Sequence, residues 1–255
     1  LWRLGLGSSP LLEAAKRYVQ AFPTVITDRK MKKLFSAIRN KNIDQVSEIL
    51  DKNPELVNCI AKGISKKDDG EIPLQTAIKT DNYDIAKLLI ERGANVKFME
   101  TKIENEEWRK PVLHYAISAV VHNSRFATYI PKYSSQNTSG FLGLFKKDQW
   151  EVKNEPTINH KKAIGILKLV IENGAELYST DNYGTSSVEL LCNEIENIQL
   201  DKTKPLEQES IADLCPVFEL IKATKISNFD LPCKRGNTIY VHYKNTINQI
   251  IAGGK

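Results

Sequence analysis

The sequence predicts an all-α fold in which pairs of short helices stack side by side into a solenoid. Three observations carry this prediction. Apolar residues recur at helical spacing in short, paired segments. A Gly-Ala step follows a helix rich in Leu and Ile at two places, residues 93–94 and 174–175. The composition, with 41% hydrophobic and 26% charged residues, is that of a globular protein and excludes a fully disordered chain.

The clearest helix pair lies in residues 70–96. Pro73 suits the first turn of a helix, because its missing N–H costs no hydrogen bond there. An apolar stripe with the spacing i, i+3, i+4 begins at Leu74, and the same spacing begins again at Ile85. Gly93 follows the second stripe and is predicted to end that helix with a positive φ. Two short antiparallel helices joined by a tight turn therefore follow from the pattern.

This segment resembles an ankyrin repeat, whose pattern is a G-x-T-P-L-H-x-A opening, a helix–turn–helix and a closing L-L-x-x-G-A. Ile72 and Gln75 stand where the family has Thr and His. The resemblance implies an ankyrin-repeat solenoid of helix-turn-helix units with finger loops between them. Residues 31–255 are expected to form this domain, and residues 1–30 an N-terminal helical extension or cap, either native or added. The expected units lie near residues 31–66, 67–98, 99–179 and 180–232, with a partial capping unit at 233–255.

The third unit is interrupted by a long insertion, residues 122–160. A typical unit has about 33 residues, so this segment is expected on the surface between the two helices of its unit. Its aromatic residues Phe141, Phe145 and Trp150 are unusual in a loop. They either fold back over the edge of the stack or serve as anchors for a partner, since exposed aromatic clusters mark interaction sites. A loop that dips into a membrane is a third and weaker interpretation.

Composition and motifs narrow the function. The formal net charge of +5 is small for this length and does not by itself indicate nucleic acid. The four cysteines form no CxxC pair and the four histidines stand singly, so neither a disulfide scaffold, a zinc site nor another metal or cofactor site is predicted. No GxSxG, HExxH or Walker-type motif is present, so no catalytic residues are assigned. A cytoplasmic protein with reduced thiols and no membrane association is expected.

A non-enzymatic module that binds another protein is therefore the leading hypothesis, because a solenoid offers a long concave face made of finger loops and first helices. The residues expected to contact the partner lie on that face or in the insertion. They are Lys67, Asp69, Glu71, Gln75, Lys79, Trp108, Arg109, Tyr115, Asn182 and Tyr183 on the face, and Phe141, Phe145 and Trp150 in the insertion.

The partner's identity stays open between two alternatives. Small ankyrin proteins of this kind resemble immunity proteins that neutralise a cognate toxin, or bacterial effectors directed at a host protein. The less favoured alternative is an enzyme or nucleic-acid binder that uses the insertion. Its candidate residues, which form no known spacing, are His122, Lys146, Lys147, Asp148 and His160.

Overall fold

The computed structural model describes residues 23–101, 108–125, 127, 130–132, 149–151, 156–199, 212–223, 243–245 and 247–248. Phe141 and Phe145 lie outside the described residues, as does most of the expected capping unit. Trp150 lies on a described strand. The helices and strands are α2 (Pro23–Arg39), α3 (Ile43–Lys52), the 3-10 helix η1 (Pro54–Asn58), α4 (Pro73–Lys79), α5 (Tyr83–Glu91), α6 (Val112–Asn123), β1 (Ile130–Lys132), β2 (Gln149–Glu151), α7 (Ile158–Glu172), α8 (Ser187–Gln199) and α10 (Cys215–Ala223).

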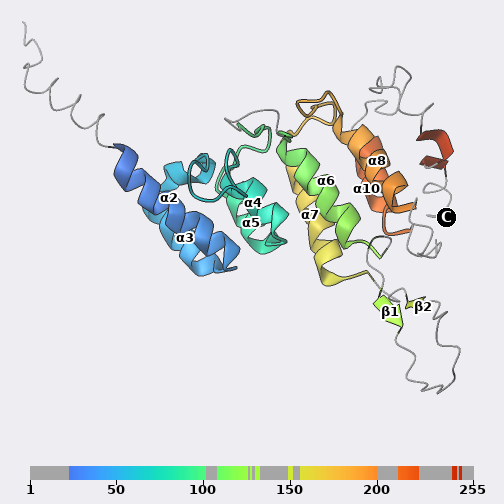
Figure 1. Cartoon of the computed structure of the whole chain (residues 1–255), viewed down its shortest axis with the longest axis horizontal. Coiled ribbons are helices and arrows are strands. Elements are labelled where there is room, and N and C mark those ends of the chain that lie inside the picture. The colour runs from blue at the N-terminus through green and yellow to red at the C-terminus, as the bar shows by residue number, and fades with distance from the viewer. Residues whose placement is uncertain are drawn as a thin grey trace, which may run out of the picture.

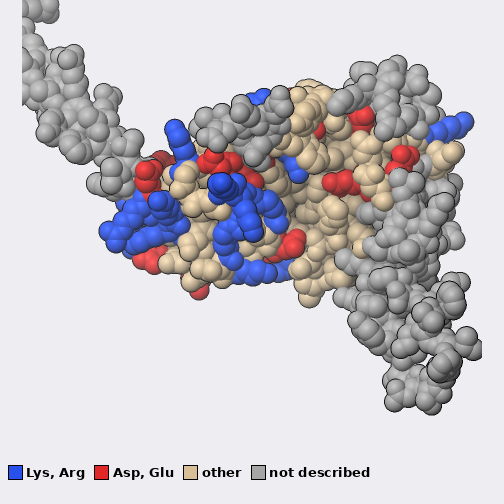
Figure 2. Space-filling model, viewed as in Figure 1, with Lys and Arg blue, Asp and Glu red and all other residues tan. Residues whose placement is uncertain are grey.

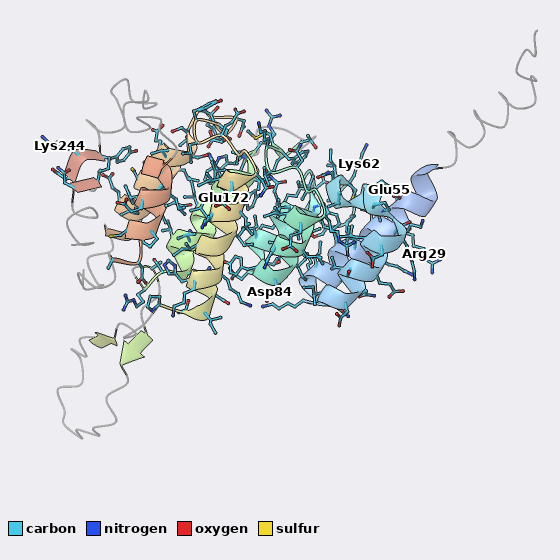
Figure 3. All side chains as sticks on the ribbon, turned by 180° about the vertical axis from the view of Figure 1, so that it is seen from behind. Arg29, Glu55, Lys62, Asp84, Glu172 and Lys244 are labelled. Carbon is cyan, nitrogen blue, oxygen red and sulfur yellow. The ribbon has the colours of Figure 1, made fainter. Side chains whose placement is uncertain are left out.

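These helices form two layers (Figure 1). The first helices of the pairs pack in the order α2, α4, α6, α8, and the second helices pack in the order α3, α5, α7, α10. Helices α2 and α6 lie toward the viewer in Figure 1, whereas α3 and α7 lie toward the viewer in Figure 3. A stack of helix pairs, predicted from the spacing of apolar residues, is therefore the observed architecture.

The turn inside a helix pair has the same geometry in the first two units. After α2, the N–H of Asn42 donates to the carbonyl of Ala37 over 3.0 Å, and Lys41 has a φ of 56°. After α4, the N–H of Asn82 donates to the carbonyl of Ala77 over 2.9 Å, and Asp81 also has a φ of 56°. This six-to-one bond with a left-handed residue satisfies helix carbonyls that would otherwise lack a donor.

The second helix of a unit ends on glycine. Gly93 has a φ of 87° and Gly174 a φ of 95°, so the positive φ predicted for Gly93 is confirmed. The next residue closes the helix in both places, since Ala94 N–H donates to Leu89 and Ala175 N–H donates to Val170. The chain then enters an extended finger loop.

In the part of the chain that the structure describes, three finger loops connect successive helix pairs, and a backbone hydrogen bond joins the two arms of each. In the first finger (residues 61–71), the N–H of Ala61 donates to the backbone carbonyl of Glu71 over 2.8 Å. In the second finger (residues 98–111), the N–H of Glu100 donates to the backbone carbonyl of Lys110 over 3.3 Å. In the third finger (residues 179–187), the N–H of Ser187 donates to the carbonyl of Ser179 over 3.2 Å. The fingers thereby project from one end of the helix pairs (Figure 1).

One apolar core runs through the stack, from Leu34 and Ile38 in α2 to Phe218 in α10. It includes Tyr243 of the C-terminal region, whose hydroxyl donates to Asn193 over 2.5 Å. Each helix pair buries its apolar stripes only against its neighbours, which is the packing expected of a repeat protein.

Three details differ from the sequence-based expectation. Helix α2 begins at Pro23 and so runs through the boundary placed between residues 30 and 31. Helix α7 begins at Ile158, inside the segment assigned to the insertion, because Thr157 caps it by accepting from the N–H of His160 over 3.0 Å. The insertion also adds β1 and β2, an antiparallel pair in which Pro131 is opposite Trp150.

Candidate functional site

A groove with a volume of about 870 Å³ opens between the first and second fingers and helices α4, α6 and α8. Its wall and rim come from the fingers and the ends of helices, and its floor comes from the first helices. The rim and wall residues are Lys66, Lys67, Glu71, Asp81, Trp108, Lys110, His122 and Asn123. The floor residues are Ile78, Lys79, Tyr115, Ser118, Ala119 and Glu194. We call this set of residues the groove.

Trp108 is the large aromatic residue of the groove wall. Its indole Nε1 donates to a carboxylate oxygen of Asp181 over 2.6 Å, although its side chain keeps 40% of its surface exposed. The ammonium of Lys110 lies 4.0 Å from the centre of the indole ring, a cation–π contact. The indole is therefore held in place and still offers apolar surface to a second molecule.

The second and third fingers are hydrogen-bonded to each other beside this tryptophan. The N–H of Arg109 donates to the side-chain oxygen of Asn182 over 2.7 Å, and the N–H of Asn182 donates to the carbonyl of Arg109. Together with the bond between Trp108 and Asp181, these contacts fix the orientation of the groove wall.

Beneath the wall lies a cluster of buried carboxylates. Glu71 accepts from the hydroxyl of Thr76 over 2.9 Å, from the hydroxyl of Tyr115 over 3.0 Å and from Lys79. The hydroxyl of Tyr115 also bonds Glu100. Burial raises the pKa of Glu71, and the nearby ammonium of Lys79 opposes that rise.

The same cluster extends to Asp68, which is buried in the first finger. Arg39 donates from Nε to Asp68 over 2.8 Å and pairs with it through a second nitrogen, so the contact is bidentate. The Nζ of Lys79 lies 3.4 Å from the same carboxylate. This network joins α2, α4 and the first finger, so its main effect is to hold the first finger over the first helices.

Glu194 lies at the other end of the groove floor. Its carboxylate accepts from the hydroxyl of Ser118 over 2.5 Å, and Nε2 of His122 lies 4.0 Å from the same oxygen. Burial raises the pKa of Glu194. The carboxylate stands between the serine and the histidine. A nucleophilic triad needs the histidine in the middle, so this arrangement does not activate Ser118.

The remaining His and Cys side chains of the described residues do not form a metal site. No group of three or more His, Cys, Asp or Glu side chains is placed to hold a metal ion among the described residues. His122 is exposed, whereas His160 is buried with its ring nitrogens 3.1 Å from the carbonyls of Val120 and Asp213. Burial raises the pKa of the Cys59 thiol to about 12, which leaves it a poor nucleophile at neutral pH.

The groove brings together Lys67, Glu71, Lys79, Trp108 and Tyr115, which the sequence placed on one face. The prediction that Gln75 contacts a partner is wrong. Its side chain is fully buried because the second finger folds over it. The side-chain amide accepts from the N–H of Ile72 over 3.1 Å and donates to the backbone carbonyl of Lys110 over 3.0 Å.

The other predicted contact residues have different surroundings. Glu71 and Tyr115 are themselves mostly buried and form part of the wall and of the floor, respectively, rather than protruding anchors. Asp69, Arg109, Asn182 and Tyr183 do not line the groove. Asp69 is half-buried and accepts from the N–H of Gly63, and the other three are exposed on the second and third fingers. Sequence reasoning missed Ser118 and Glu194, since neither belongs to a recognisable motif.

The family model for ankyrin repeats, in three copies, matches residues 34–136. This part of the chain is similar to ankyrin repeats. The match begins inside α2 and covers α3, α4, α5, α6 and the first two fingers, and α7, α8 and α10 continue the same two layers beyond it. No curated protein matches the chain. Ankyrin repeats are protein-interaction modules, and repeat domains of this kind are typically not enzymes. Within the described residues, no helix combines the length and the apolar character needed to cross a bilayer.

Proposed function

We propose that this chain binds a partner protein in the groove and acts by covering part of that partner's surface. The observation that supports the proposal is the convergence of Lys67, Lys79 and Trp108 on one hollow, although they come from two fingers and a helix. Aromatic side chains beside cationic ones are the residue types that dominate binding energy in protein interfaces.

Trp108 is the proposed anchor. Interface hot spots are rigid aromatic side chains that become fully desolvated when the partner docks. The indole meets the first requirement through its hydrogen bond to Asp181, and its exposed surface gives a partner something to bury. A stable complex buries roughly 800 Å² on each partner, so the contact extends from the groove onto the exposed parts of the fingers.

Within this function, the partner we favour is a cognate toxin in the cytoplasm, which makes the chain an immunity protein. The alternative is an effector that binds a host protein. An immunity protein and an effector of this kind would both act by covering the partner's surface, without catalysing a reaction. Co-expression with the product of the adjacent gene separates them: rescue from toxicity supports the immunity protein, and capture of a host protein supports the effector. The insertion anchors Phe141, Phe145 and Trp150 remain a second predicted contact surface.

The groove is tested by affinity capture from the source cell with the full chain, followed by mass spectrometry. Trp108→Ala is expected to remove at least one captured protein, whereas Trp108→Phe keeps a ring and retains part of the capture. The matched control is Tyr178→Ala, which removes an aromatic side chain that is 50% exposed but does not line the groove.

A thermal melt of each variant accompanies the capture, because Trp108→Ala also removes the hydrogen bond to Asp181. Equal capture by the Trp108→Ala and Tyr178→Ala chains, with both folded, would show that the groove is not the binding site.

A further inference from the structure

We infer that the groove takes an acidic segment of the partner that also carries an apolar side chain, with its carboxylates directed at the first finger. This inference rests on the proposed function and names the chemistry of its ligand. Three features of the groove support it: the distribution of charge, the pairing of some charges within the fold, and the apolar surface between the charged ends.

Two cations of the first finger line the groove. Lys66 and Lys67 are both exposed and both line the groove. Among the described residues, no carboxylate lies within ion-pairing distance of either ammonium. Two adjacent cations on a rim attract a partner's carboxylates and fix the direction in which a charged segment enters.

The carboxylates of the groove, in contrast, are already bonded to other groups of the chain. Glu71 is paired with Lys79 and with two hydroxyls, and one of the two carboxylate oxygens of Glu194 accepts from Ser118. Asp81 accepts from the hydroxyl of Tyr83 and, over 3.0 Å, from the side-chain amide of Asn123. These acids are partly compensated within the fold, so Lys66 and Lys67 supply the charge that a ligand meets first.

The charge also changes along the row of first helices. Arg39 in α2 and Lys79 in α4 each follow a buried alanine by two residues, and the corresponding residue of α6 is the neutral Ser118. The next helix in the row, α8, contributes the carboxylate of Glu194. Figure 2 shows Lys and Arg gathered over the part of this face near α2 and α4, with fewer of them toward α8. A ligand with one acidic end is therefore oriented along the groove.

Apolar surface lies between the cationic and anionic ends. Ala119 is half-buried in the floor above the buried Ile78, and Trp108 forms the wall and is partly exposed. One side of that ring is covered by the ammonium of Lys110, and the exposed remainder suits an aliphatic or aromatic side chain of the ligand. The groove thus combines a carboxylate-binding rim with a place for one apolar anchor.

A nucleic acid fits this pattern less well. It presents a phosphate at every nucleotide, so a strand lying along the groove would bring negative charge against Glu71, Asp81 and Glu194. A peptide can place carboxylates at one end only. The mixed lining of the groove therefore favours an acidic protein segment.

The test is a selection of random peptides displayed on phage against the folded full-length chain. Enriched peptides are expected to carry an excess of Asp and Glu and at least one large apolar residue. Their affinity, measured by fluorescence anisotropy of the synthetic peptides, is expected to fall about tenfold or more in the double variant Lys66→Glu/Lys67→Glu. It is also expected to weaken as the salt concentration rises.

Lys62→Glu is the matched control, because Lys62 is an exposed lysine of the same finger that does not line the groove (Figure 3). Its affinity for the selected peptides is expected to stay within about twofold of the wild type. Labelled oligothymidylate is the nucleic-acid probe, and it is expected to bind more weakly than the selected peptides.

Three outcomes would overturn the inference: enrichment of neutral or basic peptides, acidic peptides that bind Lys66→Glu/Lys67→Glu as well as the wild type, or tighter binding of oligothymidylate. If neutral peptides are selected and their binding still requires Trp108, the proposed function is supported but the inference of an acidic ligand is wrong. If the selected peptides bind the Trp108 variant and the lysine double variant as tightly as the wild type, the groove is not the binding site.

Discussion

Arg125 and Asp213 form a buried ion pair that joins the end of α6 to the turn before α10. The guanidinium donates from Nε to both carboxylate oxygens over 3.1 Å and from a terminal nitrogen over 2.7 Å, and the N–H of Arg125 adds a further bond of 2.8 Å. Both side chains are almost completely buried. The carbonyl of Asp213 also lies 3.1 Å from the ring of His160 in α7. This pair therefore ties three helices together across the stack.

Asp213→Asn should be among the most destabilising single substitutions in the chain. It removes the carboxylate charge that pairs with the buried guanidinium of Arg125, and breaking a buried ion pair in this way costs about 3–5 kcal/mol in the free energy of unfolding. Urea denaturation followed by circular dichroism measures the loss. Adding Arg125→Met to Asp213→Asn should restore part of the stability, because the buried guanidinium is then removed together with the carboxylate. Glu176→Gln, which breaks the exposed pair with Lys97, serves as the control and should cost less than about 1 kcal/mol.

Two glycine substitutions should have opposite signs. Gly93→Ala forces a residue with a Cβ into a φ of 87° and should destabilise the fold by about 1–2 kcal/mol, although nothing lies within 4 Å of the new atom. Gly165→Ala lies inside α7, also without a neighbour within 4 Å, and should stabilise by about 0.5–1 kcal/mol. The melting temperatures of the two variants, compared with that of the wild type, give the sign of each change in stability. Shifts of the same sign would contradict the assignment of Gly93 to a left-handed helix end.

His114 should make the fold sensitive to mild acid. Its burial lowers its pKa from 6.5 to about 4, with Asp181 partly opposing the shift, so the folded state favours the neutral ring. A group with a lowered pKa in the folded state stabilises the fold above its unfolded pKa. That contribution is lost as the pH falls from about 6.5 toward 4, by up to about 3 kcal/mol.

His114→Gln tests this window, because Gln75 occupies the corresponding position of the preceding unit and is accommodated there. The variant should lose less stability than the wild type between pH 7 and pH 4, as measured by urea denaturation across that range. If the free energy of unfolding falls equally for the variant and the wild type over this range, the burial of His114 does not cause the pH dependence.

Tyr115→Phe should destabilise the groove floor without changing its shape. The substitution removes the hydroxyl that bonds both Glu71 and Glu100 and leaves their buried oxygens with fewer donors, at a cost of about 1–3 kcal/mol. Chemical denaturation gives the size of the effect. If stability is unchanged, the hydroxyl contributes nothing to holding the two carboxylates.

The helix pairs could be predicted from the sequence because their signals are local. The stripe that begins at Leu74, the proline that starts α4 and the glycines at 93 and 174 each act within one turn of a helix. In a repeat protein each unit contacts only its neighbours, so local signals determine most of the architecture. The added strands β1 and β2 had no such signal, since each has only three residues.

The polar core could not be predicted in the same way. Gln75 carries a polar side chain at a position that a helical pattern treats as exposed, yet the second finger, which lies later in the sequence, covers it. Arg125 and Asp213 are separated by 88 positions, and nothing near either residue indicates the other. Glu194 belongs to the groove only because α8 packs against α6. Such contacts depend on how the units stack, and a single sequence does not specify that stacking in advance.

The insertion leaves and rejoins the stack at closely spaced points. The hydroxyl of Thr157 donates to the carbonyl of Asn123 over 3.3 Å, and β1 pairs with β2 just beyond. Because the two ends are already held together, replacing the sequence between them with a longer one adds only about 0.6 kcal/mol of closure entropy for each doubling of its length. This position is therefore suited to the insertion of a foreign peptide or reporter domain, with the helices on either side unchanged.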